Sequence, residues 1–282
     1  MDRQPTKRIL RPDNALHTGF WKTYRDILIE LASNAWLIHQ LIKRDMSSYR
    51  QSLLGIYWTI VIPFLSIFLI LSLQSSNLFL IGNLRHPYAL FAVTGLMFWQ
   101  LFSTGVISAT ESLINARELV LKINISRKAV VIASLGKAAI GFSIQFALLV
   151  LLFLFYKIPP TPYILLIPFM IIPICLLTLS IGLVLSLLNC IIRDIGMGLS
   201  FLITVFLFLT PVLYVKPTGG WLSAISHYNP VYYLIELPRE LILTGRTSNG
   251  LGYAVSIGVT LVLFVETLRF FHLSENRIAE KI

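Results

Sequence analysis

The chain has 282 residues, of which 56% are hydrophobic and 13% are charged, and its formal net charge is +10 at pH 7. Charged residues make up about one quarter of a typical soluble domain, so this composition excludes an ordinary soluble protein and predicts an integral membrane protein. The positive charge does not predict nucleic-acid binding, because the Lys and Arg residues cluster beside apolar runs and form no basic face on a separate polar domain.

The first fifty residues divide into two parts. Residues 1–19 contain Pro5, Pro12 and Gly19 and predict a flexible polar arm. No signal peptide is expected, because residues 1–50 contain no uninterrupted apolar core of the length that it requires. Residues 20–49 have helical periodicity that is interrupted at Ser33-Asn34. We interpret them as an amphipathic helix region that lies in the membrane interface, and the alternative is a helix that packs on a soluble partner.

Residues 49–63, YRQSLLGIYWTIVIP, mark the border between this polar region and the first long apolar run. Arg50 lies on the polar side of the border, and Tyr57 and Trp58 lie just inside it. Basic and aromatic residues concentrate at membrane–water interfaces in this way. A membrane domain is therefore predicted over residues 50–282.

Six apolar runs are long enough to cross a bilayer, and they predict an all-α, polytopic membrane protein. The runs cover approximately residues 53–73, 88–110, 129–156, 163–188, 195–215 and 251–271. Between the last two, residues 216–250 are rich in aromatic residues and proline but are too short to cross twice. We expect them to form two short re-entrant helices that pack on the bundle and do not face lipid.

The distribution of basic residues predicts the orientation of the spans. If the N-terminus is cytoplasmic, the segments on that side carry 17 of the 23 Lys and Arg residues and the outer segments carry five. This bias predicts that both termini are cytoplasmic. The remaining basic residue, Lys137, lies within the third span. It either faces a polar path or a substrate anion, or it snorkels toward the interface or lies on a cytoplasmic extension of the span.

The sequence contains no nucleotide-binding phosphate loop, because Gly136-Lys137 lacks both the preceding glycine and the following Ser or Thr. It also lacks HExxH and CxxC motifs, and its five His residues are scattered, so neither a metal site nor a catalytic site is expected. An enzyme of glycolipid synthesis stays as an alternative class, although it would need clustered carboxylates or a His base. A channel or secondary carrier is a third class.

Three sets of residues, in order along the spans, resemble those of ABC-2 type permeases, the membrane subunits of polysaccharide-exporting ABC transporters. The similarity begins at about residue 42 and is closest to O-antigen (lipopolysaccharide) export permeases, with capsule and teichoic acid permeases as alternatives. The residues that carry it are Tyr49-Arg50, Leu54-Gly55, Trp58 and Pro63; then Arg193-Asp194-Ile195, Thr210-Pro211-Val212 and Tyr214; then Asn229-Pro230, Arg239 and Gly245.

The resemblance implies a homodimer in the inner membrane that works with two copies of a separate ATPase subunit. That partner would bind ATP and magnesium, so this chain would need no cofactor and would be a transport subunit without enzyme activity. The implied substrate is a polyprenyl-pyrophosphate-linked polysaccharide. The interfacial region and the loop 111–128 would contact the ATPase, through the candidate coupling residues Arg44, Asp45, Arg117, Glu118, Lys122 and Asn124.

The resemblance also suggests residues along the substrate path. Arg50 and Arg193 are candidates to meet the pyrophosphate where the substrate enters, although Arg193 and Asp194 could instead pair to stabilise a short hairpin. Aromatic side chains could stack on passing sugars or could simply pack in the core; the candidates are Tyr57, Trp58, Phe98, Trp99 and Phe102. The outer gate would include Asn229, Pro230 and Tyr232.

Overall fold

The computed structural model describes residues 20–51, 86–122 and 125–278, together with positions 61, 65, 68 and 72. Every regular element in these ranges is helical, and the described part contains no strand. The prediction of an all-α protein is therefore confirmed. The predicted arm 1–19 and most of the predicted span 53–73, including Tyr57 and Trp58, lie outside the described residues.

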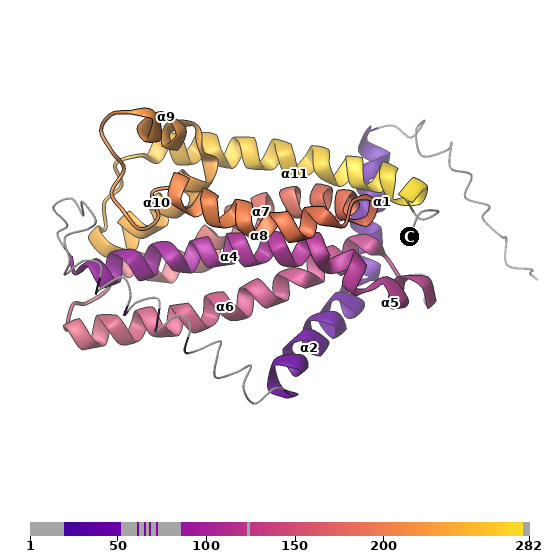
Figure 1. Ribbon diagram of the computed structural model, residues 1–282, viewed down its shortest axis with the longest axis horizontal. Helices are drawn as coiled ribbons and strands as arrows, with labels where there is room; N and C mark the ends of the chain where they lie inside the picture. The colour runs from indigo at the N-terminus through magenta and orange to yellow at the C-terminus, as the bar shows by residue number, and fades with distance from the viewer. Residues whose placement is uncertain are drawn as a thin grey trace, which may run out of the picture.

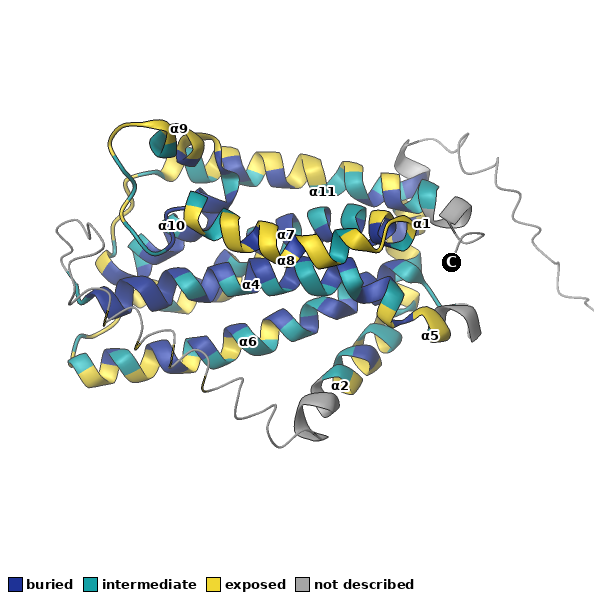
Figure 2. Cartoon of the chain, viewed as in Figure 1, coloured by how far each residue is buried: buried dark blue, intermediate teal, exposed yellow. Residues whose placement is uncertain are grey.

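Four long helices run side by side along the molecule, as Figure 1 shows: α4 (Tyr88–Asn115), α6 (Arg127–Tyr156), α7 (Ile167–Ile191) and α11 (Gly250–Ile278). α4 packs extensively on both α6 and α7. It is mostly buried along its length, whereas much of α11 is exposed (Figure 2). The apolar core is therefore built around α4, where Leu90, Met97 and Phe98 are fully buried.

These long helices correspond to four of the six predicted spans. α4, α6, the segment Pro162–Ile191 and α11 are each long and apolar enough to cross a membrane. The segment Pro162–Ile191 joins a 3-10 helix, η2 (Pro162–Leu166), to α7. α6 has 30 residues and is about 45 Å long at ~1.5 Å per residue, so it extends beyond a hydrocarbon layer of about 30 Å. A multi-pass membrane protein is confirmed.

The predicted span 195–215 is wrong in its extent, because the helix at this position, α8 (Asp194–Leu209), ends six residues earlier. Pro211 has no backbone N–H, and a proline disfavours the helical conformation of the residue before it. Thr210 accordingly has extended backbone angles, φ −100° and ψ 126°. α8 is about 24 Å long, which is less than the hydrocarbon thickness, so the predicted count of six spans is not confirmed.

Two short helices, α9 (Trp221–Tyr228) and α10 (Pro230–Thr244), are present where residues 216–250 predicted them. The packing prediction is confirmed for α10, which contacts α4 and α11 and is largely buried. α9 contacts α8, and its His227 carbonyl oxygen accepts from the Tyr233 hydroxyl of α10 at 3.0 Å, but Trp221 and Tyr228 are exposed, so its packing away from lipid stays a prediction. The re-entry of either helix into the bilayer stays a prediction.

The amphipathic region forms α1 (Phe20–Ser33) and α2 (Ala35–Gln51), with the predicted interruption at Asn34. In Figure 1 both helices lie at the opposite end of the bundle from α9 and α10, as does α5 (Arg117–Lys122), the short helix after α4. Ile27 of α1 is buried, whereas Leu28 and Trp36 are exposed. This end therefore presents apolar side chains on helices that also carry many charges.

The short connection between α7 and α8 is held by Asn189. Its Nδ2 donates to the Thr110 carbonyl oxygen at 3.2 Å, and its Oδ1 accepts from the Gly196 amide at 2.9 Å. Arg193 and Asp194 are both exposed and form no ion pair with each other. The alternative that these two residues pair to stabilise the hairpin is therefore wrong, because a buried amide from the preceding helix bridges the turn.

Candidate functional site

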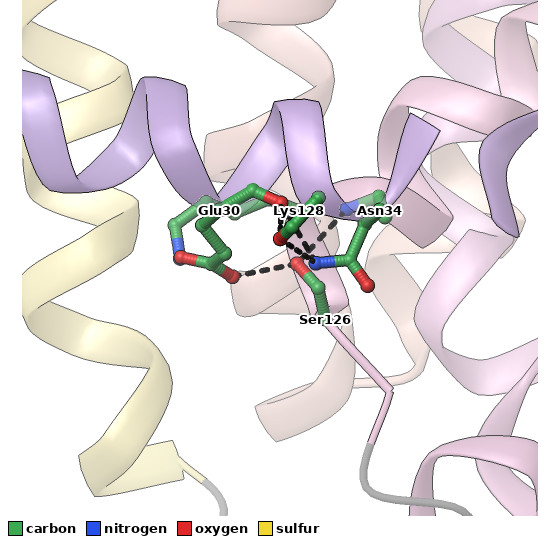
Figure 3. A network of polar contacts seen from close by, with 6 residues as sticks. Glu30, Asn34, Ser126 and Lys128 are labelled. Atoms are coloured by element: carbon green, nitrogen blue, oxygen red, sulfur yellow. Dashed lines mark hydrogen bonds and ion pairs between the residues drawn. The ribbon is translucent and has the colours of Figure 1, made fainter. Parts of the chain in front are cut away.

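A network of polar contacts joins α1 to the start of α6 (Figure 3). Ser126 precedes α6 and caps it by accepting from the Ala129 amide at 3.4 Å. The Ser126 hydroxyl donates to Glu30 Oε1 at 2.7 Å, and Lys128 Nζ donates to Glu30 Oε2 at 2.8 Å. A single carboxylate on α1 therefore binds both the cap and the first turn of α6.

The charges in this network depend on one another. The Lys128 side chain is fully buried, and a buried cation is strongly unfavourable unless it has a partner. Burial by itself would raise the pKa of Glu30, but the hydrogen bonds from Lys128 and Ser126 outweigh burial and keep the pKa of this carboxyl below its usual value. Glu30 is therefore an ionised partner that stabilises the buried Lys128.

Further contacts fix the position of α1. The Asn34 side chain and its backbone amide both donate to the Glu30 carbonyl oxygen, at 2.8 and 3.1 Å, at the turn between α1 and α2. At the other face, the Tyr24 hydroxyl donates to the Val265 carbonyl oxygen of α11 at 3.0 Å. α1 thus bridges the start of α6 and the last part of α11.

The candidate coupling residues lie at this same end of the molecule. Arg44 is half exposed on α2 and forms an ion pair with Asp45 at 3.1 Å. Arg117 and Glu118 are exposed on α5. Lys122 ends α5, but its side chain lies outside the described residues, as does Asn124. The described members of the set therefore place charges on α2 and α5 at this end of the molecule, and their contact with a partner stays a prediction.

At the opposite end, Arg239 of α10 is fully buried and holds the irregular segment after α8. Its Nη1 donates to the Val212 carbonyl oxygen at 2.6 Å, and its Nη2 donates to the Pro211 carbonyl oxygen at 3.2 Å and to Glu236. The guanidinium carbon also lies 3.8 Å from the centre of the Phe91 ring on α4. One cation therefore connects α4, α10 and the end of α8.

Asn229 completes the same cluster from the start of α10. Its Oδ1 accepts from the Val231 amide at 3.0 Å, which caps the helix, and its Nδ2 donates to the Thr210 hydroxyl at 2.8 Å. Pro230 occupies the first turn of α10, where a missing N–H costs nothing. The residues 210–212, Asn229 and Arg239, which were separate motifs in the sequence, therefore meet at one place.

The structure places the other candidate path residues as follows. Phe98, Trp99 and Phe102 are buried in the core, where Trp99 and Phe102 pack on each other and on Phe206 of α8. Tyr232 is buried, whereas Arg193 is exposed at the turn between α7 and α8. The side chain of Arg50 lies outside the described residues. Roles for these residues in a glycan path stay predictions.

The sequence interpretation missed Glu30, Ser126 and Lys128 as site residues. Ser126 had a signal, because a Ser directly before an apolar helical run is a common cap. Glu30 and Lys128 had none, since 98 positions separate them and either charge alone looks like a solvated surface residue. Among the residues that the structure describes, no group of His, Cys, Asp or Glu is arranged to hold a metal ion.

Comparison with known proteins connects both ends to one family. The profile of the ABC-2 type transporter family matches residues 37–243, which include nearly all of α2, all of α4 and nearly all of α10. An O-antigen export system permease protein RfbA from Myxococcus xanthus is 25% identical over 257 residues, or 90% of this chain and 98% of that protein. A protein of the same name from Klebsiella pneumoniae is 25% identical over 235 residues, or 82% of this chain and 89% of that protein.

A second Klebsiella pneumoniae protein of this name is 26% identical over 200 residues, or 70% of this chain and 76% of that protein. The family match covers well over half of the chain, and the relatives align along most of their own length. The resemblance that the sequence motifs suggested is confirmed. The chain belongs to the ABC-2 type transporter family and is a membrane permease related to O-antigen export permeases.

Proposed function

We propose that this chain is the membrane subunit of an ABC exporter that moves a lipid-linked polysaccharide of the O-antigen type across the inner membrane. The observation that carries the proposal is its similarity, along 90% of its length, to a protein named as an O-antigen export permease. The sequence has no phosphate loop, so the energy for transport comes from a separate ATPase subunit. Two copies of the chain would work with two copies of that ATPase.

The charge asymmetry of the sequence supports an orientation with α1, α2 and α5 on the cytoplasmic side. In that orientation the exposed charges of α5 and α2 face the ATPase. A displacement of α1 would act on α6 through Glu30 and on α11 through Tyr24, because these contacts join α1 to both long helices. Movement of the ATPase could then change the packing of two spans at once.

The outer end would act as the support for an outer gate. Asn229, Pro230 and Tyr232 lie at the start of α10, and Arg239 anchors this helix to α4. The substrate would enter past Arg50 and Arg193 at the cytoplasmic side, where its pyrophosphate needs cationic partners. The aromatic residues would contact sugars only in a state that exposes Phe98, Trp99 and Phe102, which are buried in this protomer.

Reconstitution with the partner tests the proposal. The chain would be co-purified with a candidate ABC ATPase, sought first in the neighbouring reading frames, and placed in vesicles that contain a polyprenyl-diphosphate-linked polysaccharide. ATP is expected to move the glycan to the far leaflet, as measured by its accessibility to an added lectin. The control is the same complex with the phosphate-loop Lys of the ATPase replaced by Ala. Equal accessibility with both complexes, for lipid-linked O-antigen, capsule and teichoic acid glycans alike, would refute the proposed function.

A further inference from the structure

A polar cavity of about 270 Å³ lies between α2, α4 and α6, toward the end of the bundle that carries α1 and α5. Figure 1 shows α2 approaching this end of α4 and α6 at an angle. The close approach of α2 is fixed at Gly136 of α6, where a Cβ atom would lie 3.0 Å from Ile42 of α2. Lys137, the next residue on α6, lines the cavity, as do Ser108 and Asn115 of α4.

The position of the cavity along the helices corresponds to the head-group layer of a bilayer. From Lys137 to Tyr156, at the far end of α6, the helix rises about 29 Å at ~1.5 Å per residue. From Tyr88 to Ser108, α4 rises about 30 Å by the same measure. If the tyrosines mark one hydrocarbon boundary, Lys137 and Ser108 both lie at the other, because the hydrocarbon layer is about 30 Å thick.

The cavity carries one uncompensated positive charge. Arg44 and Asp45 both line it and form an ion pair with each other, so their charges cancel. Lys137 lines it too and makes no hydrogen bond or ion pair with any described residue. A cation at membrane depth that has no protein partner and faces a hollow is the arrangement expected for a site that receives an anion.

Hydrogen-bond donors around Lys137 are also available. The side chains of Ser108 and Asn115 donate to no described group. Ser112 and Ser134 differ, because their hydroxyls donate to the carbonyl oxygens of Ala109 and Val131 on their own helices. The unused donors of Lys137, Ser108 and Asn115 thus surround a space smaller than a typical drug-sized pocket of roughly 300 to 1,000 Å³.

We propose that this cavity binds the phosphate group of a membrane lipid, with Lys137 as the principal ligand and Ser108 and Asn115 as further donors. Its depth favours a lipid over a soluble anion, and basic pockets between membrane helices are known to take anionic head groups. The same chemistry fits two sources, a bulk anionic phospholipid and the diphosphate of a polyprenyl carrier. The inference rests on the membrane location of the chain and holds whether or not the exported glycan is O-antigen.

Binding of defined lipids to the purified full-length chain tests this site. Three ligands are titrated in neutral detergent and the bound fraction is followed by native mass spectrometry: phosphatidylglycerol, polyprenyl diphosphate and inorganic phosphate. Lys137→Gln is expected to weaken binding of at least one lipid by about tenfold or more, since it removes a charged hydrogen-bond donor. Lys137→Arg is expected to retain binding and shows that the position tolerates substitution.

Lys157→Gln is the matched control, because it removes a cation from the end of the same helix without touching the cavity. It is expected to bind both lipids as the unmodified chain does. A Lys137-dependent preference for the diphosphate identifies the carrier as the ligand, and a preference for phosphatidylglycerol identifies a bulk lipid. Equal lipid binding by Lys137→Gln and Lys157→Gln, or Lys137-dependent binding of inorganic phosphate alone, would overturn the proposal. Neither result depends on transport.

Discussion

The two ends of the helix bundle hold their short helices in different ways. At the α10 end, Arg239 and Asn229 bind backbone and hydroxyl groups of the segment 210–212, and both are buried. At the α1 end, one partly exposed carboxylate, Glu30, carries the contacts to α6. The first arrangement satisfies an irregular backbone inside the bundle, whereas the second joins one helix to another through a carboxylate that is partly exposed.

This difference suggests that one end of the bundle is more rigid than the other. A buried cation that satisfies two carbonyl groups and a carboxylate cannot release them without a large cost in free energy, because each would lose its partner away from water. A shift of α1, in contrast, would reach α6 through Glu30 and α11 through the Tyr24 hydroxyl, so these long helices can follow its movement. We therefore expect the α10 end to behave as a rigid support and the α1 end as the part that moves.

The largest effect should come from Arg239→Met. Methionine fills similar space but leaves Glu236 and the carbonyl oxygens of Pro211 and Val212 without their donor, so unfolding should become easier by about 3–5 kcal/mol. Thermal unfolding in detergent measures the change. Arg246→Met, at an exposed position just after α10, is the control and should unfold as the original chain does. Equal stability of the two variants would remove the idea of a rigid support.

Glu30→Gln should have the next largest effect. It removes the carboxylate that accepts from Lys128 Nζ at 2.8 Å and should cost about 2–3 kcal/mol, less than the first variant because Glu30 is partly exposed. The loss should be concentrated in α1 and the first turn of α6, as faster amide hydrogen exchange would show. Asp26→Asn, at an exposed position on the same helix, is the control. Unchanged exchange in α1 would contradict an attachment through Glu30.

Gly95→Ala should have a smaller effect and sharpens the picture of the α10 end. A Cβ atom at Gly95 would lie 2.8 Å from the Val212 carbonyl oxygen and 2.9 Å from Arg239 Nη1, so the alanine variant should lose about 1–3 kcal/mol. Gly258 of α11 is the control, because a Cβ atom added there would have no atom within 4 Å of it. Gly258→Ala should be neutral or slightly stabilising. If both variants unfold at the same temperature, the contact between α4 and the Arg239 cluster can accommodate an added methyl group.

The pH dependence of α1 follows from the lowered pKa of Glu30. Its depressed pKa in the folded chain means that the contribution of Glu30 to stability is present above the unfolded pKa and is lost as pH falls through the folded pKa. Amide exchange in α1, corrected for its intrinsic pH dependence, should therefore accelerate below about pH 4.3. Glu30→Gln should abolish this acceleration, and its persistence in that variant would assign it to another group.

Much of the membrane domain could be predicted from sequence because long apolar runs have few alternatives to a helix in lipid. The end of α8 was missed because hydropathy continues through Val212 and Tyr214, although Pro211 had already given the local signal. The burial of Arg239 could not be predicted, because a buried guanidinium needs acceptors. Its acceptors include the carbonyl oxygens of Pro211 and Val212, which only the folded turn after α8 brings near. Phe98 and Trp99 suit a core and a sugar path equally well by residue type, and only packing places them in the core of this protomer.

The smallest effect on stability, and the sharpest test of the moving end, should come from charge reversal on α5. Glu118 is exposed, so Glu118→Lys combined with Lys122→Glu should leave thermal unfolding unchanged while it reverses the charge pattern on this helix. Charge pairs at an interface set register and specificity, so the doubly reversed chain should co-purify with less of its ATPase and export less glycan. Arg246→Glu, at the opposite end, is the control for a change of charge. Normal recovery of the ATPase and normal export by the reversed chain would remove α5 from the contact and leave α1 and α2 as the remaining candidates.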